Sequence, residues 1–136
     1  MTKVKKINYI FTVGRRKEST ARVRLFHGKA ENTVNGMPAS KYFPGKLAEK
    51  AMAKPLGATE MSEKYYYSAK VAGGGKEGQL SALILGISRA LVKVSSEKNK
   101  LTLKKLGLLT RDSRERQRRM VGKGGKARRA KQSPKR

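Results

Sequence analysis

Two short stretches of the sequence combine cations or glycines in a pattern that could bind phosphate groups. In the first, GRRKESTARVR, the cations Arg15, Arg16 and Lys17 fall in the connection between two predicted strands, where they can reach an anion without disturbing a sheet. In the second, the loop Gly73–Gly78 directly precedes a predicted helix, whose first backbone N–H groups and positive dipole end favour an anion. We predict phosphate contact for both stretches. For the glycine loop, a flexible connection between strand and helix is an equally good interpretation.

The sequence offers no set of residues suited to catalysis, nucleotide binding or metal binding. Lys76 is followed by Glu77 rather than by Ser or Thr, so the loop lacks the nucleotide P-loop pattern. The chain has no cysteine and one histidine, His27, which falls in a predicted turn. Its 9 Asp and Glu residues are scattered among cations, whereas acid–base catalysis needs carboxyl groups in a shared cleft. We therefore expect a protein that is not an enzyme and that holds no metal and no cofactor.

The charge balance indicates a polyanionic partner. The 34 Lys and Arg residues outnumber the acids so far that the formal net charge is +25, and such self-repulsion opposes a compact state unless an anion screens it. From Arg111 onward there are 12 basic and 2 acidic residues, a net charge of +10, which leaves +15 for residues 1–110. Nucleic acid is the favoured partner. A DNA-compacting protein and a cationic membrane-active polypeptide are alternatives. The latter would need a basic amphipathic helix, whereas the best apolar stripe, Leu80–Val94, carries modest charge and fits a core, so we expect no membrane partner.

Residue periodicity predicts the elements that position these side chains. Strands are expected over Tyr9–Val13, Ala21–Phe26 and Glu63–Ala72, a short strand near Thr33, a helix over Ser40–Lys54 that is broken at Pro44 and closed by Pro55, and helices over Glu77–Val94 and Glu97–Leu106. In the third strand, alternation places Tyr65 and Tyr67 on one face and Tyr66 on the other, and core packing is a better interpretation of these rings than base stacking. In the helix Glu77–Val94 we expect Ser88 on the polar face. The fold class is α+β, with helices packed on one sheet.

The composition changes abruptly after Thr110. The last sixteen residues, VGKGGKARRAKQSPKR, contain a single sizeable apolar side chain, so they cannot bury enough surface to offset the entropy of ordering a chain. We predict a globular domain over residues 1–110 and an extended basic tail over residues 111–136.

Three motifs of the chain occur in the same order in a known family. With VGRRKESTARV, GGGKEGQLSALILGISRAL and GLLTRDSRERQRR…GKGGKARRAKQSPKR, the chain resembles bacterial-type small-subunit ribosomal protein nine. The resemblance implies a βαβ-type fold of the ribosomal-protein-five domain-two kind, bound to small-subunit ribosomal RNA in the subunit head beside other head proteins. It also implies a cytoplasmic ribosomal location. In that family the tail threads between RNA helices, and its terminal Lys-Arg pair reaches transfer RNA in the peptidyl site.

Pattern and resemblance together give the expected contact residues. For ribosomal RNA they are Arg15, Arg16, Lys17, Arg22, Gly73, Gly74, Gly75, Lys76, Arg111, Arg114, Arg116, Arg118, Arg119, Lys123, Lys126, Arg128, Arg129 and Lys131, and for transfer RNA they are Lys135 and Arg136. The tip departs from the family, which typically ends Gln-Phe-Ser-Lys-Arg, because Ser133 and Pro134 precede the terminal pair here. Pro134 fixes its own φ and biases Ser133 toward an extended conformation, which reduces the entropy lost on docking.

Overall fold

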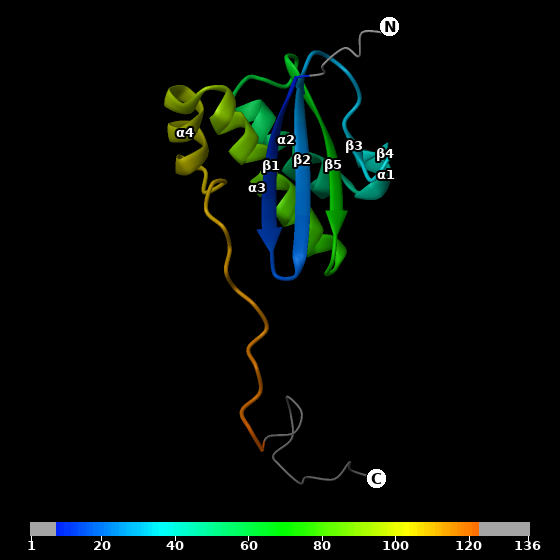
Figure 1. Cartoon of the computed structure of the whole chain (residues 1–136), viewed down its shortest axis with the longest axis vertical. Coiled ribbons are helices and arrows are strands. Elements are labelled where there is room, and N and C mark those ends of the chain that lie inside the picture. The colour runs from blue at the N-terminus through cyan, green and yellow to red at the C-terminus, as the bar shows by residue number, and fades with distance from the viewer. Residues whose placement is uncertain (1–7, 123–136) are drawn as a thin grey trace, which may run out of the picture.

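The computed structural model describes residues 8–122 of the chain (Figure 1). Its elements in chain order are β1 (Tyr9–Arg16), β2 (Ser19–His27), β3 (Thr33–Val34), β4 (Met37–Pro38), α1 (Ala39–Tyr42), α2 (Lys46–Ala58), β5 (Tyr65–Ala72), α3 (Lys76–Val94) and α4 (Ser96–Lys105). The strands and the two final helices predicted from the sequence are confirmed, with their ends shifted by a few residues. Within this part of the chain, no helix is long and apolar enough to span a membrane.

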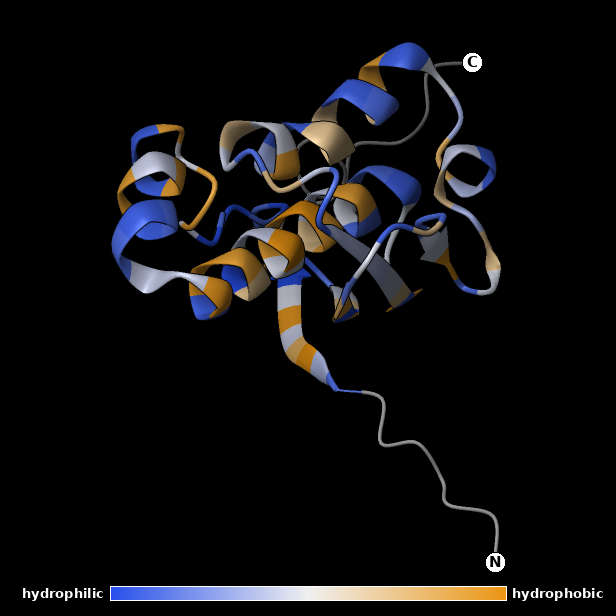
Figure 2. Ribbon diagram, turned by 90° about the horizontal axis from the view of Figure 1, so that it is seen from above, coloured by the Kyte–Doolittle hydropathy of each residue, from blue (hydrophilic) through white to orange (hydrophobic). Residues whose placement is uncertain are grey.

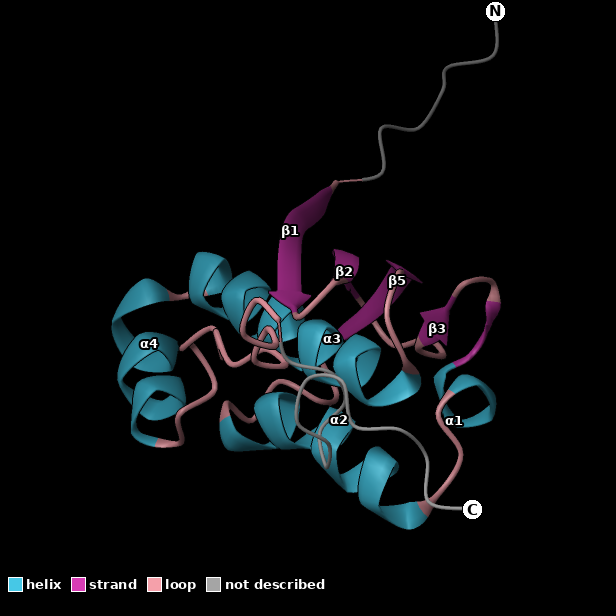
Figure 3. Cartoon of the chain, turned by 90° about the horizontal axis from the view of Figure 1, so that it is seen from below, coloured by secondary structure: helices cyan, strands magenta, loops and turns pink. Residues whose placement is uncertain are grey.

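The five strands form one mixed sheet in the order β1-β2-β5-β3-β4. β1 pairs antiparallel with β2, β2 pairs antiparallel with β5, and β3 runs parallel to β5. The parallel pair needs a crossover, which the helices α1 and α2 provide. Figure 3 shows the strands as an outer layer with α2, α3 and α4 all on the same side of it. The α+β class is confirmed. The narrower fold name and the long extended tail stay predictions.

The core lies between the sheet and α3. Alternation along the strands buries Val23 and Leu25 of β2 and Tyr67, Ala69 and Val71 of β5 on the inner face, as predicted. α3 packs against this face, α2 covers the far side of α3, and Figure 2 shows the hydrophobic residues gathered at the centre of the molecule. The sheet, α3 and α2 are thus three successive layers.

The burial of Ser88 in α3 corrects one prediction. Its side chain, expected on a polar face, has no exposed surface. Its hydroxyl donates to the carbonyl oxygen of Ile84 at 2.8 Å, which satisfies the buried group. Because other elements cover α3 on both sides, the helix has no broad face left for solvent.

β1 and α3 approach each other so closely that their backbones touch. An ideal Cβ on Gly14 would lie 1.9 Å from the carbonyl oxygen of Ala82 and 2.5 Å from the backbone nitrogen of Gly86. At the same crossing, the hydroxyl of Thr12 donates to the carbonyl oxygen of Gly86 at 2.7 Å. Two glycines therefore let β1, and the hairpin that follows it, sit directly on the helix.

Cations cover the free edge of β1. Arg89 donates to the carbonyl oxygen of Val13 at 2.8 Å, and Lys93 donates to that of Phe11 at 3.0 Å. Both side chains come from α3. They use backbone acceptors that an unpaired edge strand would otherwise offer to another chain.

The helices before β5 differ from the prediction at one proline. The break at Pro44 is confirmed, because α1 ends at Tyr42 and α2 begins at Lys46. The expectation that Pro55 closes the second helix is wrong, since α2 continues to Ala58. Pro55 is fully buried, and this apolar packing offsets the backbone hydrogen bond that a proline inside a helix lacks.

Candidate nucleic-acid interface

The hairpin between β1 and β2 presents its cations through a two-residue turn, Lys17 and Glu18. Lys17 has φ +51°, a left-handed conformation that is strained for a residue with a Cβ. Arg15 and Lys17 are exposed, and no carboxylate of the described residues pairs with either. Arg16 instead pairs with Asp112, with 2.9 Å between Nη1 and Oδ2. The predicted cluster thus contains two free cations and one that holds the start of the tail.

The glycine loop is packed against this hairpin. Gly73 and Gly74 have φ +77° and +59°, and a Cβ on them would meet the carbonyl oxygen of Glu18 at 2.5 Å and the hydroxyl of Ser19 at 2.3 Å. That hydroxyl donates to the carbonyl oxygen of Gly73 at 3.0 Å. The positive φ values and the close packing therefore explain why these two positions are glycine, and a bound anion is not needed to explain them. Gly75 is different, because a Cβ there would meet nothing within 4 Å.

The hairpin, the loop and the tail enclose a hollow of about 490 Å³ at the start of α3. Gly75 caps α3, and within residues 8–122 no side-chain cap satisfies the free N–H groups of the first turn. These donors and the positive end of a 19-residue helix create an anion-binding potential there. The lining residues are Lys17, Glu18, Ser19, Gly74, Gly75, Lys76, Glu77, Gly78, Glu115 and Arg116.

Side-chain charge inside the hollow is balanced. Lys17, Lys76 and Arg116 face three glutamates there, so the lining side chains carry no net formal charge. Lys76 is also engaged elsewhere, because its ammonium donates to the carbonyl oxygen of Tyr42 at 3.2 Å and lies 3.4 Å from the centroid of the Tyr42 ring. The attraction for an anion therefore comes from the amides of the helix and from the cations around the rim.

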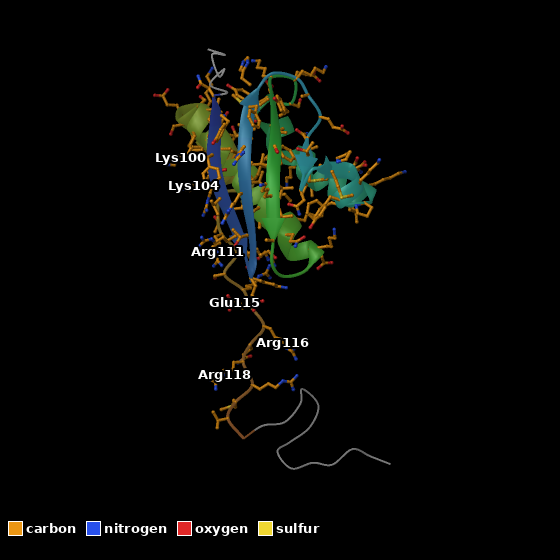
Figure 4. All side chains as sticks on the ribbon, turned by 45° about the vertical axis from the view of Figure 1, so that its right-hand side comes forward. Lys100, Lys104, Arg111, Glu115, Arg116 and Arg118 are labelled. Carbon is orange, nitrogen blue, oxygen red and sulfur yellow. The ribbon has the colours of Figure 1, made fainter. Side chains whose placement is uncertain are left out.

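Asp112 connects the segment that follows α4 to the hairpin. It pairs with Arg16 and also accepts hydrogen bonds from the backbone and side chain of Arg114, at 3.0 Å and 2.7 Å. The hydrogen bonds from Arg114, with the charge of Arg16 added, hold the pKa of the Asp112 carboxyl well below its usual range. The tail thus begins beside the hairpin. Figure 4 shows Arg111 near the hairpin end of the sheet, with Arg116 and Arg118 successively farther along the tail.

The predicted contact residues fall into separate groups in the structure. Lys17, Gly74, Gly75, Lys76 and Arg116 line the hollow. Gly73 is not among the lining residues, but its carbonyl oxygen accepts a hydrogen bond from Ser19, which is one of them. Arg15 and Arg16 line a smaller depression beside Asp112. Arg111, Arg114, Arg118 and Arg119 are exposed on the tail. The remaining predicted residues, Lys123, Lys126, Arg128, Arg129, Lys131, Lys135 and Arg136, lie outside the described residues.

Arg22 lies apart from the hollow, on the sheet face that no helix covers. It stands directly opposite Lys70 of β5, and Arg24 is on the same face. Sequence reasoning did not select Arg24 or Lys70, although their alternation with buried residues was visible. It also passed over Lys100 and Lys104, which Figure 4 shows on α4.

Comparisons with known proteins agree with the three motifs. A family model described as ribosomal protein S9/S16 matches residues 14–136. Small ribosomal subunit protein uS9 of Leifsonia xyli subsp. xyli is 46% identical over 124 residues, which cover 91% of this chain and 73% of that protein. The proteins of the same name from Saccharopolyspora erythraea and Renibacterium salmoninarum are 44% and 43% identical, and cover 92% and 91% of this chain over 80% and 74% of their own lengths. The resemblance seen in the motifs is confirmed. The chain therefore belongs to the ribosomal protein S9/S16 family, and as a member of it is a structural ribosomal protein rather than an enzyme.

Proposed function

We propose that this chain is a constituent of the small subunit of the cytoplasmic ribosome, that it binds small-subunit ribosomal RNA in the subunit head beside other head proteins, and that its tail tip contacts peptidyl-site transfer RNA. Its family and the names of its relatives support the ribosomal role. The net charge of +25 supports an RNA partner, because an RNA backbone supplies the anions that screen it.

One observation carries the proposal for the domain: the Arg16–Asp112 ion pair brings the tail to the hairpin. Lys17 of the hairpin, the uncapped amides of α3 and Arg116 of the tail therefore surround one hollow, and Arg15 lies beside it. All of these groups are suited to phosphate oxygens, which are the same in every sequence. The site accordingly positions the protein on the RNA backbone without selecting a sequence.

A salt titration with matched variants tests this site. Arg15→Gln combined with Lys17→Gly removes the two unpaired hairpin cations, keeps the Arg16–Asp112 pair and allows the left-handed turn. If both cations contact phosphate, the slope of log affinity for ribosomal RNA against log salt becomes shallower by about 1.4 to 1.8. Lys50→Gln combined with Lys54→Gln on α2 makes the same charge change far from the hairpin and leaves the slope unchanged. Equal slopes for both double variants would place the interface elsewhere.

The proposal for the tail tip depends on how far the extended tail can carry its last two residues from the domain. Sixteen residues from Val121 onward span at most about 50 Å when extended, so Lys135 and Arg136 can meet a partner that the domain never touches. A hydrogen bond to a charged group contributes about 1.5 to 3 kcal/mol, which is enough to hold transfer RNA longer but not to decide whether it binds. Both residues position the transfer RNA and perform no chemistry.

Deleting the two terminal residues tests the tip. Purified small subunits should contain the shortened protein at normal levels, because the upstream cations remain, and should release peptidyl-site transfer RNA faster. Normal incorporation with an unchanged release rate would refute the contact. Loss of the protein from the particle would show that the tip serves assembly instead.

A further inference from the structure

The uncovered face of the sheet carries rings and cations side by side. Register places Tyr9, Phe26 and Tyr66 in one row across β1, β2 and β5. The rings of Phe26 and Tyr66 stack with centroids 5.2 Å apart, and those of Tyr9 and Phe26 are 5.7 Å apart. Figures 1 and 3 show no helix in front of this face. Tyr9 is 47% exposed, and the partly buried rings of Phe26 and Tyr66 do not belong to the buried core cluster, unlike Tyr67.

The cations of this face have no carboxylate to balance them. Arg22 and Lys70 are direct cross-strand partners, an arrangement in which like charges repel. Arg24, one row nearer the rings, lies with its guanidinium carbon 5.2 Å from the centroid of the Tyr9 ring. The outward strand positions of β1, β2 and β5 hold no acid, and no ion pair of the described residues involves these three cations. The face is therefore complementary to a polyanion.

We propose that this face binds an unpaired segment of RNA, with a base stacked on Tyr66 and the adjoining phosphates held by Arg22, Arg24 and Lys70. Phe26 covers one side of the Tyr66 ring, and Tyr66 makes no other ring contact within the described residues. A base on its second side extends the stack. Rows on one face of a strand are about 6.6 to 6.8 Å apart, so the three cations lie one and two rows from the stacked rings.

Rings beside cations on an open sheet suit single-stranded RNA in particular. The bases of an unpaired segment are free to stack on aromatic side chains, whereas those of a duplex are already stacked on each other. An acidic protein segment would satisfy the cations but would leave the row of rings unused. The inference rests on the proposed RNA-binding function and adds a second surface to it, which lies apart from the hollow at the start of α3.

The test compares two probes with equal charge. Short oligouridylate carries bases, and an abasic ribose-phosphate oligomer of the same length carries the same number of phosphates. Each stacked base strengthens binding about five- to 140-fold, so the full-length chain should prefer oligouridylate at least about fivefold. Replacing Tyr9, Phe26 and Tyr66 by leucine should abolish the preference, whereas Tyr9→Phe with Tyr66→Phe should retain it. Equal affinity of the parent for both probes, or a preference that survives the leucine variant, would overturn the proposal.

A second measurement covers the case in which the leucine variant does not fold. The chain contains no tryptophan, so Tyr66→Trp introduces a single fluorescent reporter at the proposed stacking position. Oligouridylate should quench its emission, and the abasic oligomer should not. Equal quenching by oligoglutamate, or none by oligouridylate, would overturn base stacking.

The two proposals fail in different ways. A flattened salt slope for the hairpin variant together with no preference between the probes would leave the proposed function intact and remove only this surface. Absence of binding to ribosomal RNA and to both probes would remove the proposed function as well.

Discussion

Gly14→Ala is the most direct test of how the hairpin proposed to contact RNA is positioned. The added methyl group would lie 1.9 Å from the carbonyl oxygen of Ala82 and 2.5 Å from the backbone nitrogen of Gly86. Neither is a flexible side chain that could turn away, so β1 must move outward from α3. This shift also breaks the buried hydrogen bond from Thr12 to Gly86. Because β1 leads directly into the turn at Lys17, the change disturbs both the core and the hairpin.

The expected loss follows from the two contacts. Overpacking a core costs about 1 to 3 kcal/mol and occasionally more, and leaving a buried polar group without its partner costs about 1 to 3 kcal/mol. We expect Gly14→Ala to lower the free energy of unfolding by about 2 to 6 kcal/mol, and the melting temperature by at least about 8 °C. Gly57→Ala is the matched control, since a Cβ there meets nothing within 4 Å and the residue is exposed in α2. It should raise stability by about 0.5 to 1 kcal/mol.

The assay is urea unfolding of the full-length chain, followed by far-ultraviolet circular dichroism in a sulfate buffer that screens the net positive charge. Opposite signs for the two glycine substitutions are the expected result. A Gly14→Ala variant within about 0.5 kcal/mol of the parent would refute the backbone contact between β1 and α3.

Three further predictions concern single contacts. Asn99 is buried and donates to the carbonyl oxygen of Leu91 at 2.7 Å, so Asn99→Ala should cost about 1 to 3 kcal/mol in urea unfolding. Burial raises the pKa of Tyr67 to about 12, so the neutral phenol is favoured in the folded state. The contribution of Tyr67 to stability is complete below its unfolded pKa of about 10 and falls between pH 10 and 12, and this fall should be absent from Tyr67→Phe. Asp112→Asn should speed tryptic cleavage of the tail at neutral pH, while Glu115→Gln, which breaks no ion pair in the described residues, should leave the cleavage rate unchanged.

Most of the fold could be predicted because the spacing of apolar residues along the chain indicates which segments form strands and which form helices. Alternation in β2 and β5 gave the correct inner face, and the end of α4 was visible in Gly107, which has φ +71° and follows the last turn as a C-terminal cap. The two wrong predictions, for Ser88 and Pro55, result from tertiary packing. Ser88 is buried because a second layer covers α3, and Pro55 stays helical because its ring packs in the core, and neither packing partner is near these residues in sequence.

The candidate site was predictable as a set of residues but not as an arrangement. Net charge and motif order identified the hairpin, the loop and the tail. They could not show that Gly73 and Gly74 are fixed by contact with Glu18 and Ser19, because that contact joins residues far apart in sequence. Nor could they show that Lys76 is held by Tyr42.

Asp112 shows why composition alone describes a basic tail incompletely. The sequence places it just inside a strongly cationic stretch, where one of only two carboxylates looks incidental. In the structure it pairs with both Arg16 and Arg114, so two of the cations expected to contact RNA are already engaged. Pairing with Asp112 lowers the affinity of these two arginines for phosphate. In return, it holds the start of the tail beside the hairpin. Under the proposed function, a tail that starts beside the hairpin meets the same RNA surface as the hairpin, whereas an untethered tail of equal charge could bind any nearby phosphate. Asp112→Asn should therefore leave the affinity for ribosomal RNA nearly unchanged or higher, and impair the placement of the tail in assembled subunits.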